Sequence, residues 1–447
     1  MVNRGRPKGA PNTYERCIDA GEELFARHGF DGASIRDIAG AVGITNGSVF
    51  NHFKSKERLY GAVFERLVAS VTAYVSGAAM EPDLSSVVDF FDRFLSWCLE
   101  KPHYAQLLNR ELMENHLRLV RAQTLHLGEP VSVVVDQIRT GQNLGVLRTC
   151  DAEVFTFYTL GAIAHFSVAV PTLGRLMNDD MGETRARFRT ALLDHVVTAL
   201  TVSPPGFCYA GADAFEAPSP AASRLGQGFP VDELTTRERC LIVAEALFAR
   251  GGFAAMGMRE MAKDCGISTA AVLHHFKSKD KLYGEVLDRL RESLSGYFAE
   301  MLFATDFECV VEYFERFMLW CFEKPHYSRL LLRELIESRD CAVKGRKFYF
   351  SSPVPLVIEK IRRGQSLGYF RALDAEMFTY YILGAATHFS ASAPTIDRML
   401  VEDMGSPQAR FRRVLVNHIV SGLTPVAWAA NPHGEWLPQA AALESGA

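Results

Sequence analysis

The most constraining feature of this chain is that one long segment occurs twice, always at the same distance. The chain has 447 residues, and short runs from its first half return after a fixed step, as from position 53 to position 276. Among them are Phe53-Lys54-Ser55-Lys56 with Phe276-Lys277-Ser278-Lys279, Glu100–Tyr104 with Glu323–Tyr327, and Gly141-Gln142 with Gly364-Gln365. A constant step over such a span means two ungapped copies of one domain. Because there are only two copies and each is long, the pattern indicates a duplication and not a solenoid array.

The composition is that of an ordinary folded protein, with 48% hydrophobic and 22% charged residues. A length of 447 residues is too great for one hydrophobic core and fits two to four domains. The net charge of -4 argues against a protein that coats nucleic acid. A local DNA-binding face remains possible, because such a face needs a basic patch on the surface and not a net positive charge of the whole protein.

Neither a membrane span nor a secretory leader is expected. We identify no apolar run that approaches ~18–20 residues without a charge, so we predict no transmembrane helix. The run from Met1 to Lys8 lacks the apolar region of a signal peptide. Nine cysteines without a Cys-x-x-Cys pair fit neither a zinc site nor a disulfide framework. We expect buried, reduced thiols in a bacterial cytoplasm, with redox sensing as the alternative, and no metal or cofactor.

Shifts in composition divide the chain into seven segments. Both copies have the pattern of helices nearly throughout, since apolar residues recur at spacings of three and four, as in Phe90, Phe94 and Trp97. No stretch shows sustained alternation, so we expect an all-α fold without a sheet. The expected segments are a basic arm (1–13), a first head (14–60) and body (61–203), a linker rich in Pro, Ala, Gly and Ser (204–234), a second head (235–283) and body (284–424), and a disordered tail (425–447).

The start of each copy has the capping pattern of a helix-turn-helix. In copy one, a first helix should end at Gly29, because glycine is a favourable C-terminal cap residue. Ser34 and Asp37 form a capping box that should start a second, short helix. That helix should end at Gly43, where the absence of a Cβ permits the tight turn between two short helices.

The third helix of copy one has the polar residues of a DNA-reading helix. Two short helices at a steep angle let the second lie in the major groove, with its N-terminal end toward the bases. Asn can pair bidentately with adenine, Ser and Thr can reach several base edges, and lysines just beyond can hold phosphates. Thr45 should cap this helix and Ser55 the next one. The candidate DNA contacts of copy one are Arg36, Thr45, Asn46, Gly47, Ser48, Phe50, Asn51, His52, Lys54 and Lys56.

These residues resemble the DNA-binding domain of the tetracycline-repressor (TetR) family. The resemblance is carried by the runs Ser34–Ala39, Gly43-Ile44, Val49–Lys56 and Leu59-Tyr60, and it extends over both copies. It implies an all-α tandem of two-domain units, each with a small helix-turn-helix head on a larger helical body. In the family the body binds an effector and dimerises through its last two helices. In this chain those helices begin near Asp151, Glu183, Asp374 and Ser406.

Copy two departs further than copy one from the family's pattern. Phe50 and Leu273 stand where the family usually has a tyrosine that meets a phosphate, so both heads should lose a backbone contact. Asn46 and Thr269 stand where it often has lysine. In copy two, Gly257 also replaces the capping serine. The alternative to a DNA-reading head is a packing module that no longer reads DNA, and it weighs more for copy two. The candidate contacts there are Arg259, Ser268, Thr269, Ala271, Leu273, His274, His275, Lys277 and Lys279.

The N-terminal arm distinguishes the two heads. Its run Arg4-Gly5-Arg6-Pro7-Lys8-Gly9 resembles an AT-hook core, in which Gly and Pro keep the strip thin and extended. Arg4 and Arg6 could then enter a narrow A·T minor groove, where the potential is most negative. The alternative is a solvated basic tail with nonspecific attraction. No equivalent run precedes copy two.

Each body repeats a set of aromatic and polar residues that the family resemblance places around an effector cavity. An apolar cavity with few polar groups would suit a hydrophobic or aromatic effector. The alternative is structural, because a Phe/Trp stripe at helical spacing is more often core, a histidine in an apolar helix is more often a satisfied core residue, and Arg-Glu neighbours can form ion pairs. His165 can also lie near the dimer interface. The candidate ligand-binding residues are Phe94, Trp97, His103, Tyr104, Arg110 and His165, with Phe317, Trp320, His326, Tyr327, Arg333 and His388.

We therefore expect a ligand-responsive transcriptional regulator, with a repressor favoured, that binds a double-stranded DNA operator and a small-molecule effector. The two bodies can pair within one chain and present two unlike heads to an asymmetric operator. A linker of ~30 residues spans up to roughly 100 Å, which allows this arrangement. A homodimer of tandem chains with four heads is the alternative assembly, and a sensor or adaptor with degenerate heads is the alternative function. An enzyme is not expected, since no catalytic motif occurs.

Overall fold

The computed structural model describes residues 12–77, 81–114, 128–177, 179–201, 235–298, 305–341, 353–400, 405–424, 428–430 and 436–438. Most of the expected basic arm and all of the expected linker therefore lie outside the described residues. Within them, helices dominate both copies, which confirms the all-α tandem fold.

The two copies have the same order of helices. Copy one contains α1 (Thr13–Gly32), α2 (Ile35–Val42), α3 (Asn46–Phe53), α4 (Lys56–Val75), α5 (Leu84–Glu100), α6 (Pro102–Glu114), α7 (Gly128–Asn143), α8 (Ala152–Met177) and α9 (Met181–Leu200). Copy two contains α10 (Thr236–Ala255), α11 (Met258–Asp264), α12 (Thr269–Phe276), α13 (Lys279–Phe298), α14 (Asp306–Glu323), α15 (Pro325–Cys341), α16 (Pro353–Ser366), α17 (Ala375–Ile396) and α18 (Pro407–Leu423).

The caps predicted for copy one start its short helices. The Asp37 amide donates to Ser34 Oγ (3.2 Å), and the Ser34 amide donates back to Asp37 Oδ2 (3.0 Å), which completes the capping box of α2. Hydrogen bonds from the Ser34 hydroxyl and the Ser34 amide lower the pKa of the Asp37 carboxyl. Gly43 ends α2 with a φ of 72°, in the left-handed region where a glycine is favoured. Thr45 and Ser55 cap α3 and α4 as predicted.

The first helix of each copy differs from the prediction at its end. Gly29 interrupts α1 with a φ of 70°, but one more helical turn follows and α1 ends at Gly32. The same interruption occurs in α10 at Gly252, where φ is 76°. Glycine breaks the helix axis here without ending the helical segment, because the chain resumes helical angles after the break.

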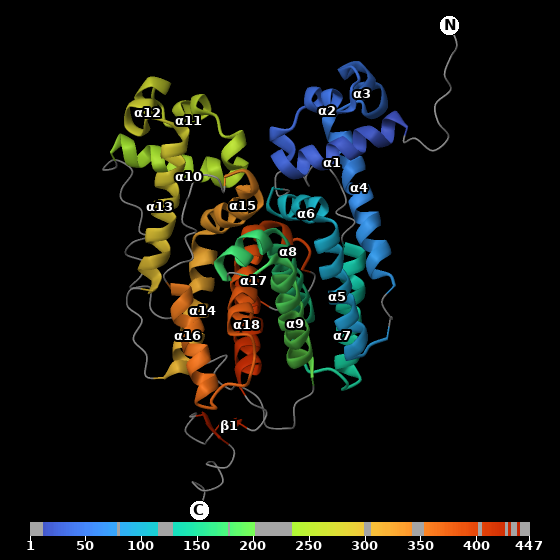
Figure 1. Ribbon diagram of the computed structural model, residues 1–447, viewed down its shortest axis with the longest axis vertical. Coiled ribbons are helices and arrows are strands. Elements are labelled where there is room, and N and C mark those ends of the chain that lie inside the picture. The colour runs from blue at the N-terminus through green and yellow to red at the C-terminus, as the bar shows by residue number, and fades with distance from the viewer. Residues whose placement is uncertain are drawn as a thin grey trace, which may run out of the picture.

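The heads lie side by side at one end of the molecule, and the bodies fill the rest (Figure 1). Helices α1 to α3 form the first head and α10 to α12 the second. The long helices α4 and α13 run from each head down along its body. The expected boundaries after residues 60 and 283 therefore fall inside one continuous helix in each copy, so the head is rigidly attached to the body.

The two bodies pack against each other through the last two helices of each copy. Helix α8 packs along α17, while α9 and α18 contact each other and the helices of the opposite copy, at the centre of the view (Figure 1). His165 of α8 lies against Gly384 of α17, and His388 lies against Gly161 in return. A Cβ on either glycine would come within 3 Å of the histidine ring, so glycine permits this close approach.

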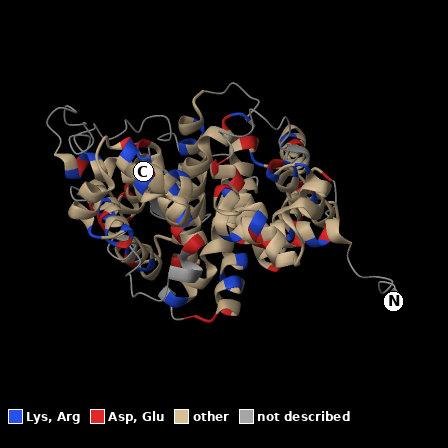
Figure 2. Ribbon diagram, turned by 90° about the horizontal axis from the view of Figure 1, so that it is seen from above, with Lys and Arg blue, Asp and Glu red and all other residues tan. Residues whose placement is uncertain are grey.

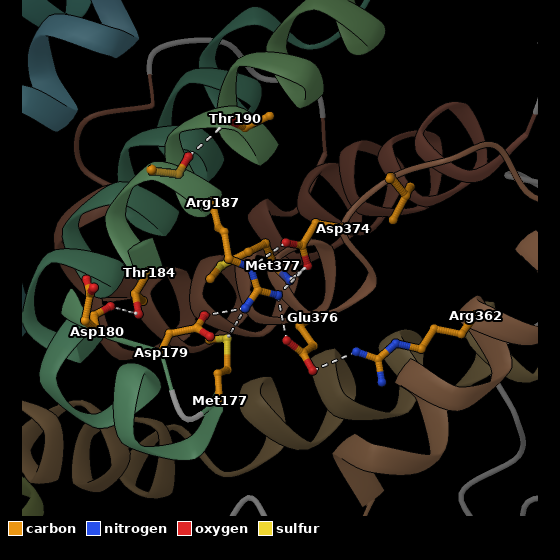
Figure 3. Close-up of polar contacts among 12 residues, drawn as sticks. Met177, Asp179, Asp180, Thr184, Arg187, Thr190, Arg362, Asp374, Glu376 and Met377 are labelled. Carbon is orange, nitrogen blue, oxygen red and sulfur yellow. Dashed lines mark hydrogen bonds and ion pairs between the residues drawn. The ribbon is translucent and has the colours of Figure 1, made fainter. Parts of the chain in front are cut away.

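Reciprocal ion pairs flank this helical interface. In α9, Arg187 Nε donates to Asp374 Oδ2 (2.8 Å) at the start of α17, and its Nη2 donates to Glu376 (2.6 Å) (Figure 3). Arg410 makes the equivalent contacts with Asp151 (2.6 Å) and Glu153 (3.0 Å). Because Arg410 is only 1% exposed, its charge requires these carboxylates. The contacts fix the register of the two copies.

The expectation that no long uncharged apolar run occurs is wrong. Helix α8 contains a segment, Ala152–Arg175, that is long and apolar enough to cross a membrane by length and composition. In this structure 83% of that apolar window is buried inside the protein. The segment is apolar because α8 packs against helices of both copies, as does the matching helix α17.

The expected disordered tail contains a short strand pair. Strand β1 (Trp428–Ala430) pairs antiparallel with β2 (Trp436–Pro438), with Ala429 opposite Leu437. Each strand has three residues. This differs from the expectation of no sheet, because a run this short has no detectable alternation, although tryptophan favours strands.

Candidate nucleic-acid interface

The polar residues predicted on the first recognition helix face solvent. Val49 and Phe53 of α3 are buried against the head, so the opposite side of the helix is presented outward at the tip of the molecule (Figure 1). Of the predicted contacts, Ser48 and Lys56 are half-buried, and the exposed ones are Arg36, Thr45, Asn46, Gly47, Phe50, Asn51, His52 and Lys54.

Helix α12 occupies the equivalent position in the second head with a different outer surface. Val272 and Phe276 are its buried residues. The exposed predicted contacts are Arg259, Ser268, Leu273, His274 and Lys277, while Thr269, Ala271, His275 and Lys279 are half-buried. The preceding helix α11 begins at Gly257 without a side-chain cap, as the sequence indicated. The two heads therefore share a backbone arrangement but offer different side chains.

An exposed apolar residue stands on each recognition helix. Phe50 is 45% exposed and Leu273 is 41% exposed. They occupy the positions at which the family resemblance implies a phosphate-contacting hydroxyl. Neither side chain can donate a hydrogen bond, so any contact there with DNA would be to sugar or base carbon atoms.

A lysine ends each recognition helix in a left-handed conformation. Lys54 and Lys277 both have a φ of 64°, and within the described residues they are the non-glycine residues with positive φ. Such a conformation costs of order 1 kcal/mol for a residue with a Cβ. Lys54 Nζ donates to the Asn51 carbonyl (3.2 Å), so its ammonium stays beside the exposed face of α3. The sequence pattern placed both lysines correctly at the helix ends but did not predict the backbone strain.

The lysines two residues further on lie over aromatic rings. Lys56 Nζ is 4.3 Å from the ring centre of Phe30, and Lys279 Nζ is 4.6 Å from that of Phe253. Burial lowers the pKa of Lys279. These cation–π contacts hold the ammonium groups close to the head surface, which restricts how far they can reach toward a phosphate.

Basic and acidic residues are interspersed around the heads. Seen from above, the basic segments (blue) and the acidic segments (red) are scattered among one another (Figure 2). The predicted arm residues Arg4 and Arg6 lie outside the described residues. A DNA face here would therefore depend on a few placed lysines and arginines and not on a broad positive field.

Two of the predicted ligand-binding residues of copy one, Tyr104 and Arg110, join the body to the head, while Trp97 joins two helices along the body. Trp97 Nε1 donates a hydrogen bond to Ser70 Oγ (3.1 Å) of α4. The Tyr104 hydroxyl donates a hydrogen bond to Glu22 of α1. Burial and this carboxylate raise the pKa of Tyr104 to about 12. Arg110 Nε donates to the Ala26 carbonyl (3.0 Å) at the end of α1. Tyr104 and Arg110 therefore position the head.

Copy two repeats the same connections. Trp320 donates to Ser293 (3.1 Å), Tyr327 donates to Glu245 (3.0 Å), and Arg333 Nε donates to the Ala249 carbonyl (2.8 Å). The predicted aromatic residues Phe94 and Phe317 are buried beside the tryptophan rings. In this structure these candidate ligand residues therefore belong to packed core and to head attachment.

The two head-positioning arginines meet at the junction between the copies. Arg333 Nη2 donates to Glu114 of the other copy (2.8 Å), and Arg110 lies 3.7 Å from Glu337. Both arginines are about 2% exposed, and burial lowers the pKa of Arg110. Each head is thus linked to the body of the other copy, and α1 also contacts α10.

The four predicted histidines separate into two kinds. His103 is exposed and His326 is half-buried, 3.9 Å from Glu245. His165 and His388 are buried in the interface, where burial lowers their pKa to about 3 and about 4. The interface position anticipated for His165 is confirmed by its contact with Gly384.

Sequence reasoning missed the residues that depend on contacts between the copies. These are the arginines at positions 187 and 410 and the adjacent pair His195 and His418, whose ring centres are 3.3 Å apart. One signal was present, because each of these residues recurs at the constant step between the copies. In the part of the chain that the structure describes, no group of three His, Cys, Asp or Glu residues could hold a metal ion.

Comparison with known proteins identifies the two heads. The family model described as "Bacterial regulatory proteins, tetR family" matches residues 18–63 and 241–286, one match in each head. The chain is 23% identical over 187 residues to the transposon Tn10 TetC protein of Escherichia coli, covering 41% of this chain and 91% of that protein. It is 32% identical over 96 residues to the HTH-type transcriptional repressor Rv3405c of Mycobacterium tuberculosis, covering 22% of this chain and 51% of that protein.

Solved structures of similar proteins cover about one copy of the tandem. The ketosteroid transcriptional regulator KstR2 of Mycobacterium tuberculosis is 19% identical with a TM-score of 0.35, covering 43% of this chain and 96% of that chain. The TetR family transcriptional regulator PfmR of Thermus thermophilus is 19% identical with a TM-score of 0.31, covering 40% of this chain and 97% of that chain. Rv3405c is described as a transcriptional repressor, and KstR2 and PfmR are described as transcriptional regulators. On its two matched DNA-binding domains, the chain belongs to the TetR family of transcriptional regulators, with two tandem copies of the family's unit in one polypeptide.

Proposed function

We propose that the chain is a ligand-responsive repressor that acts in the cytoplasm and presents two unlike heads to one asymmetric operator. The observation that carries the proposal is the packing of α8 and α9 against α17 and α18 within a single chain. This packing places α3 and α12 at the same end of the molecule (Figure 1). The names of the relatives support repression, because several are called transcriptional repressors.

Each head would read its own half-site. In copy one, Asn46, Ser48 and Asn51 would read base edges, since asparagine matches adenine and serine adapts to several bases. In copy two, Thr269 and His274 would take that role. Heads of this kind must enter successive major grooves, ~34–36 Å apart. Because the two sets of side chains differ, the half-sites would differ as well.

Lysines at the helix ends would set the register on the phosphates. Lys54 and Lys277 are exposed and held in the same backbone conformation in both heads. Phosphate contacts of this kind position a protein on DNA without reading sequence. The arm with Arg4 and Arg6 would add an A·T preference on the flank of copy one only.

Effector binding in the bodies would change the separation of the heads. The path for this signal is short, because α4 and α13 each join a head to its body, and Arg110 and Arg333 hold the ends of α1 and α10. A shift of the bodies would therefore move the heads as rigid units. DNA affinity would change through a shift of population between two head spacings.

The test is selection of binding sites from random duplex DNA by the full chain, followed by a footprint on the selected sequence. The proposal predicts one site with two unlike half-sites about a turn apart. Asn51→Ala should weaken binding by about 1–3 kcal/mol and relax one half-site. His274→Ala, the change at the equivalent position, should act on the other half-site.

Other results would identify a different function. A palindromic site would mean that copy-one heads pair between chains and that copy two has another role. No enrichment would favour a sensor or adaptor whose heads no longer read DNA. The uncapped start of α11 and the alanines of α12 are the features that would fit that alternative for copy two.

A further inference from the structure

A polar cluster lies at the centre of the interface between the two bodies. His195 of α9 and His418 of α18 lie against each other there, with ring centres 3.3 Å apart and the rings tilted by 31°, and Tyr158 and Tyr381 pack against them. Tyr158 and His195 recur as Tyr381 and His418 at the constant step of the repeat, so the cluster has two similar sides. A cavity adjoins each side.

The two cavities differ strongly in size. The one on the side of Arg371 has a volume of about 160 Å³, whereas the one on the side of Arg148 has about 20 Å³. Most of their lining residues occupy equivalent positions of the two copies. Where the large cavity has Ala191 and Ala372, the small one has the bulkier Val414 and Thr149.

The two histidines, which both line both cavities, differ in their hydrogen bonding. On His418, Nδ1 pairs with the Tyr158 hydroxyl (2.6 Å). His195 is only 4% exposed and lines the large cavity, yet neither of its ring nitrogens has a hydrogen-bond partner in the protein. A buried polar group without a partner costs of order 1–3 kcal/mol, so a partner from outside the chain would be stabilising.

The charged residues of the large cavity are already paired. Arg371 Nη1 donates to Asp194 (2.9 Å), and Asp374 accepts from Arg187 (2.8 Å). No net charge among these groups is left for a ligand to neutralise. The remaining lining includes the aromatic rings of Phe378 and Tyr381.

These features define a class of ligand. A cavity of ~150 Å³ lined by apolar groups is large enough for benzene. A single aromatic ring would therefore fit the volume and the aromatic lining, and one hydroxyl or amide group could pair with a nitrogen of His195. A larger or charged molecule would meet the paired carboxylates and guanidinium groups.

We infer that the large cavity is a binding site for a neutral, single-ring aromatic molecule with one hydrogen-bonding substituent, and that the chain has one such site. Thr190 and Ala372, which are exposed, form the rim through which it would enter. The site lies between the copies, apart from the candidate residues Trp97 and Trp320 inside each body. The inference rests on the proposed function in its assumption that the bodies sense a small molecule.

The experiment is fluorine NMR titration of the full chain with 4-fluorophenol in the absence of DNA. The expected result is saturable binding at one site per chain, with fluorobenzene bound about tenfold more weakly because it lacks the hydroxyl. His195→Phe keeps a ring but removes both nitrogens, so it should also weaken the binding of 4-fluorophenol by about tenfold.

Matched variants locate the site. Ala191→Val with Ala372→Thr copies the small cavity onto the large one and should abolish binding. Thr149→Ala with Val414→Ala makes the opposite change on the other side and should retain the site. Each altered residue already occurs at the equivalent position of the repeat, and thermal melting checks that both variants fold.

Two results would overturn the inference: no saturable binding to the unaltered chain, or binding that survives Ala191→Val with Ala372→Thr or is lost in Thr149→Ala with Val414→Ala. Selection of duplex DNA is measured separately. An absence of DNA binding with one 4-fluorophenol site would refute the proposed function alone. DNA binding without that site would refute this inference alone.

Discussion

At the scale of single residues, the lysines that end the recognition helices combine a strained backbone with an exposed charge. Lys54 and Lys277 adopt the same positive φ in two heads whose recognition helices differ at other exposed positions, such as Asn51 and His274. Glycine or asparagine would adopt this conformation at lower cost. A lysine at this position is explained if its ammonium is needed beside the outer face of the recognition helix.

We predict that Lys54→Gly raises the free energy of unfolding by up to about 1 kcal/mol, because it removes the strain. The same change should weaken DNA binding and reduce the dependence of log affinity on log salt by about one. Urea unfolding and titrations at several salt concentrations measure the two effects. Lys54→Ala is the control, since it removes the charge but keeps the strain. A glycine variant that is less stable, or that binds DNA unchanged, would contradict this account of Lys54.

Buried histidines should make the stability of the protein depend on pH. Burial lowers the pKa of His165 to about 3 and of His388 to about 4, below the value of ~6.5 for an unfolded chain. The unfolded state therefore binds more protons between these values, so stability falls as pH decreases below about 6.5. The slope should reach about 1.4 kcal/mol per pH unit for each histidine.

Urea unfolding at pH 7, 6 and 5 measures this slope. His388→Asn should reduce the slope by the contribution of one histidine. His103→Gln, a change at an exposed position, should leave the slope unaltered. A stability that stays constant from pH 7 to pH 5 would show that these histidines are not buried as described.

At the scale of elements, the contact between α8 and α17 depends on two glycines. Gly161 and Gly384 lie where the histidine of the opposite helix approaches, and a Cβ at Gly161 would be 2.9 Å from His388 Nδ1. The helices can approach this closely only without a side chain at these positions. The interface between the copies is therefore sensitive to a single methyl group.

Gly161→Ala should lower the free energy of unfolding by about 1–3 kcal/mol, the usual cost of overpacking a core. Gly61→Ala is the matched control, because Gly61 lies in helix α4 with nothing within 4 Å of its Cβ position. That control should raise stability by about 0.4–1 kcal/mol. Equal effects of the two changes would mean that α8 and α17 do not pack as described.

The short helices of the heads could be predicted from the sequence because their signals are local. Ser34 and Asp37 are three residues apart, and Gly43 ends the same helix, so one short window contains the whole pattern. The interface could not be predicted in this detail, since Arg187 and Asp374 are far apart in the chain and periodicity shows only which face is buried. Trp97 and Arg110 illustrate the same limit: a core position was expected for Trp97, but its partner on α4 was not, and neither was the burial of Arg110 against α1.

At the scale of the whole molecule, duplication within one chain allows the two halves to differ. A dimer of identical chains must change both halves together, whereas here each half has its own sequence. The recognition helices have diverged, and so have the two interface cavities. The ion pairs that Arg187 and Arg410 form with the opposite copy are present on both sides. The copies thus differ at the places where recognition is proposed.

The central claim is that one chain, with both of its heads, occupies one operator. Native mass spectrometry of the full chain with its selected duplex tests this most directly, because it counts chains per DNA molecule. The account predicts one chain per duplex, and a complex that is lost when either half-site is replaced by random sequence. Two chains per duplex, or binding that depends on only one of the two half-sites, would contradict it.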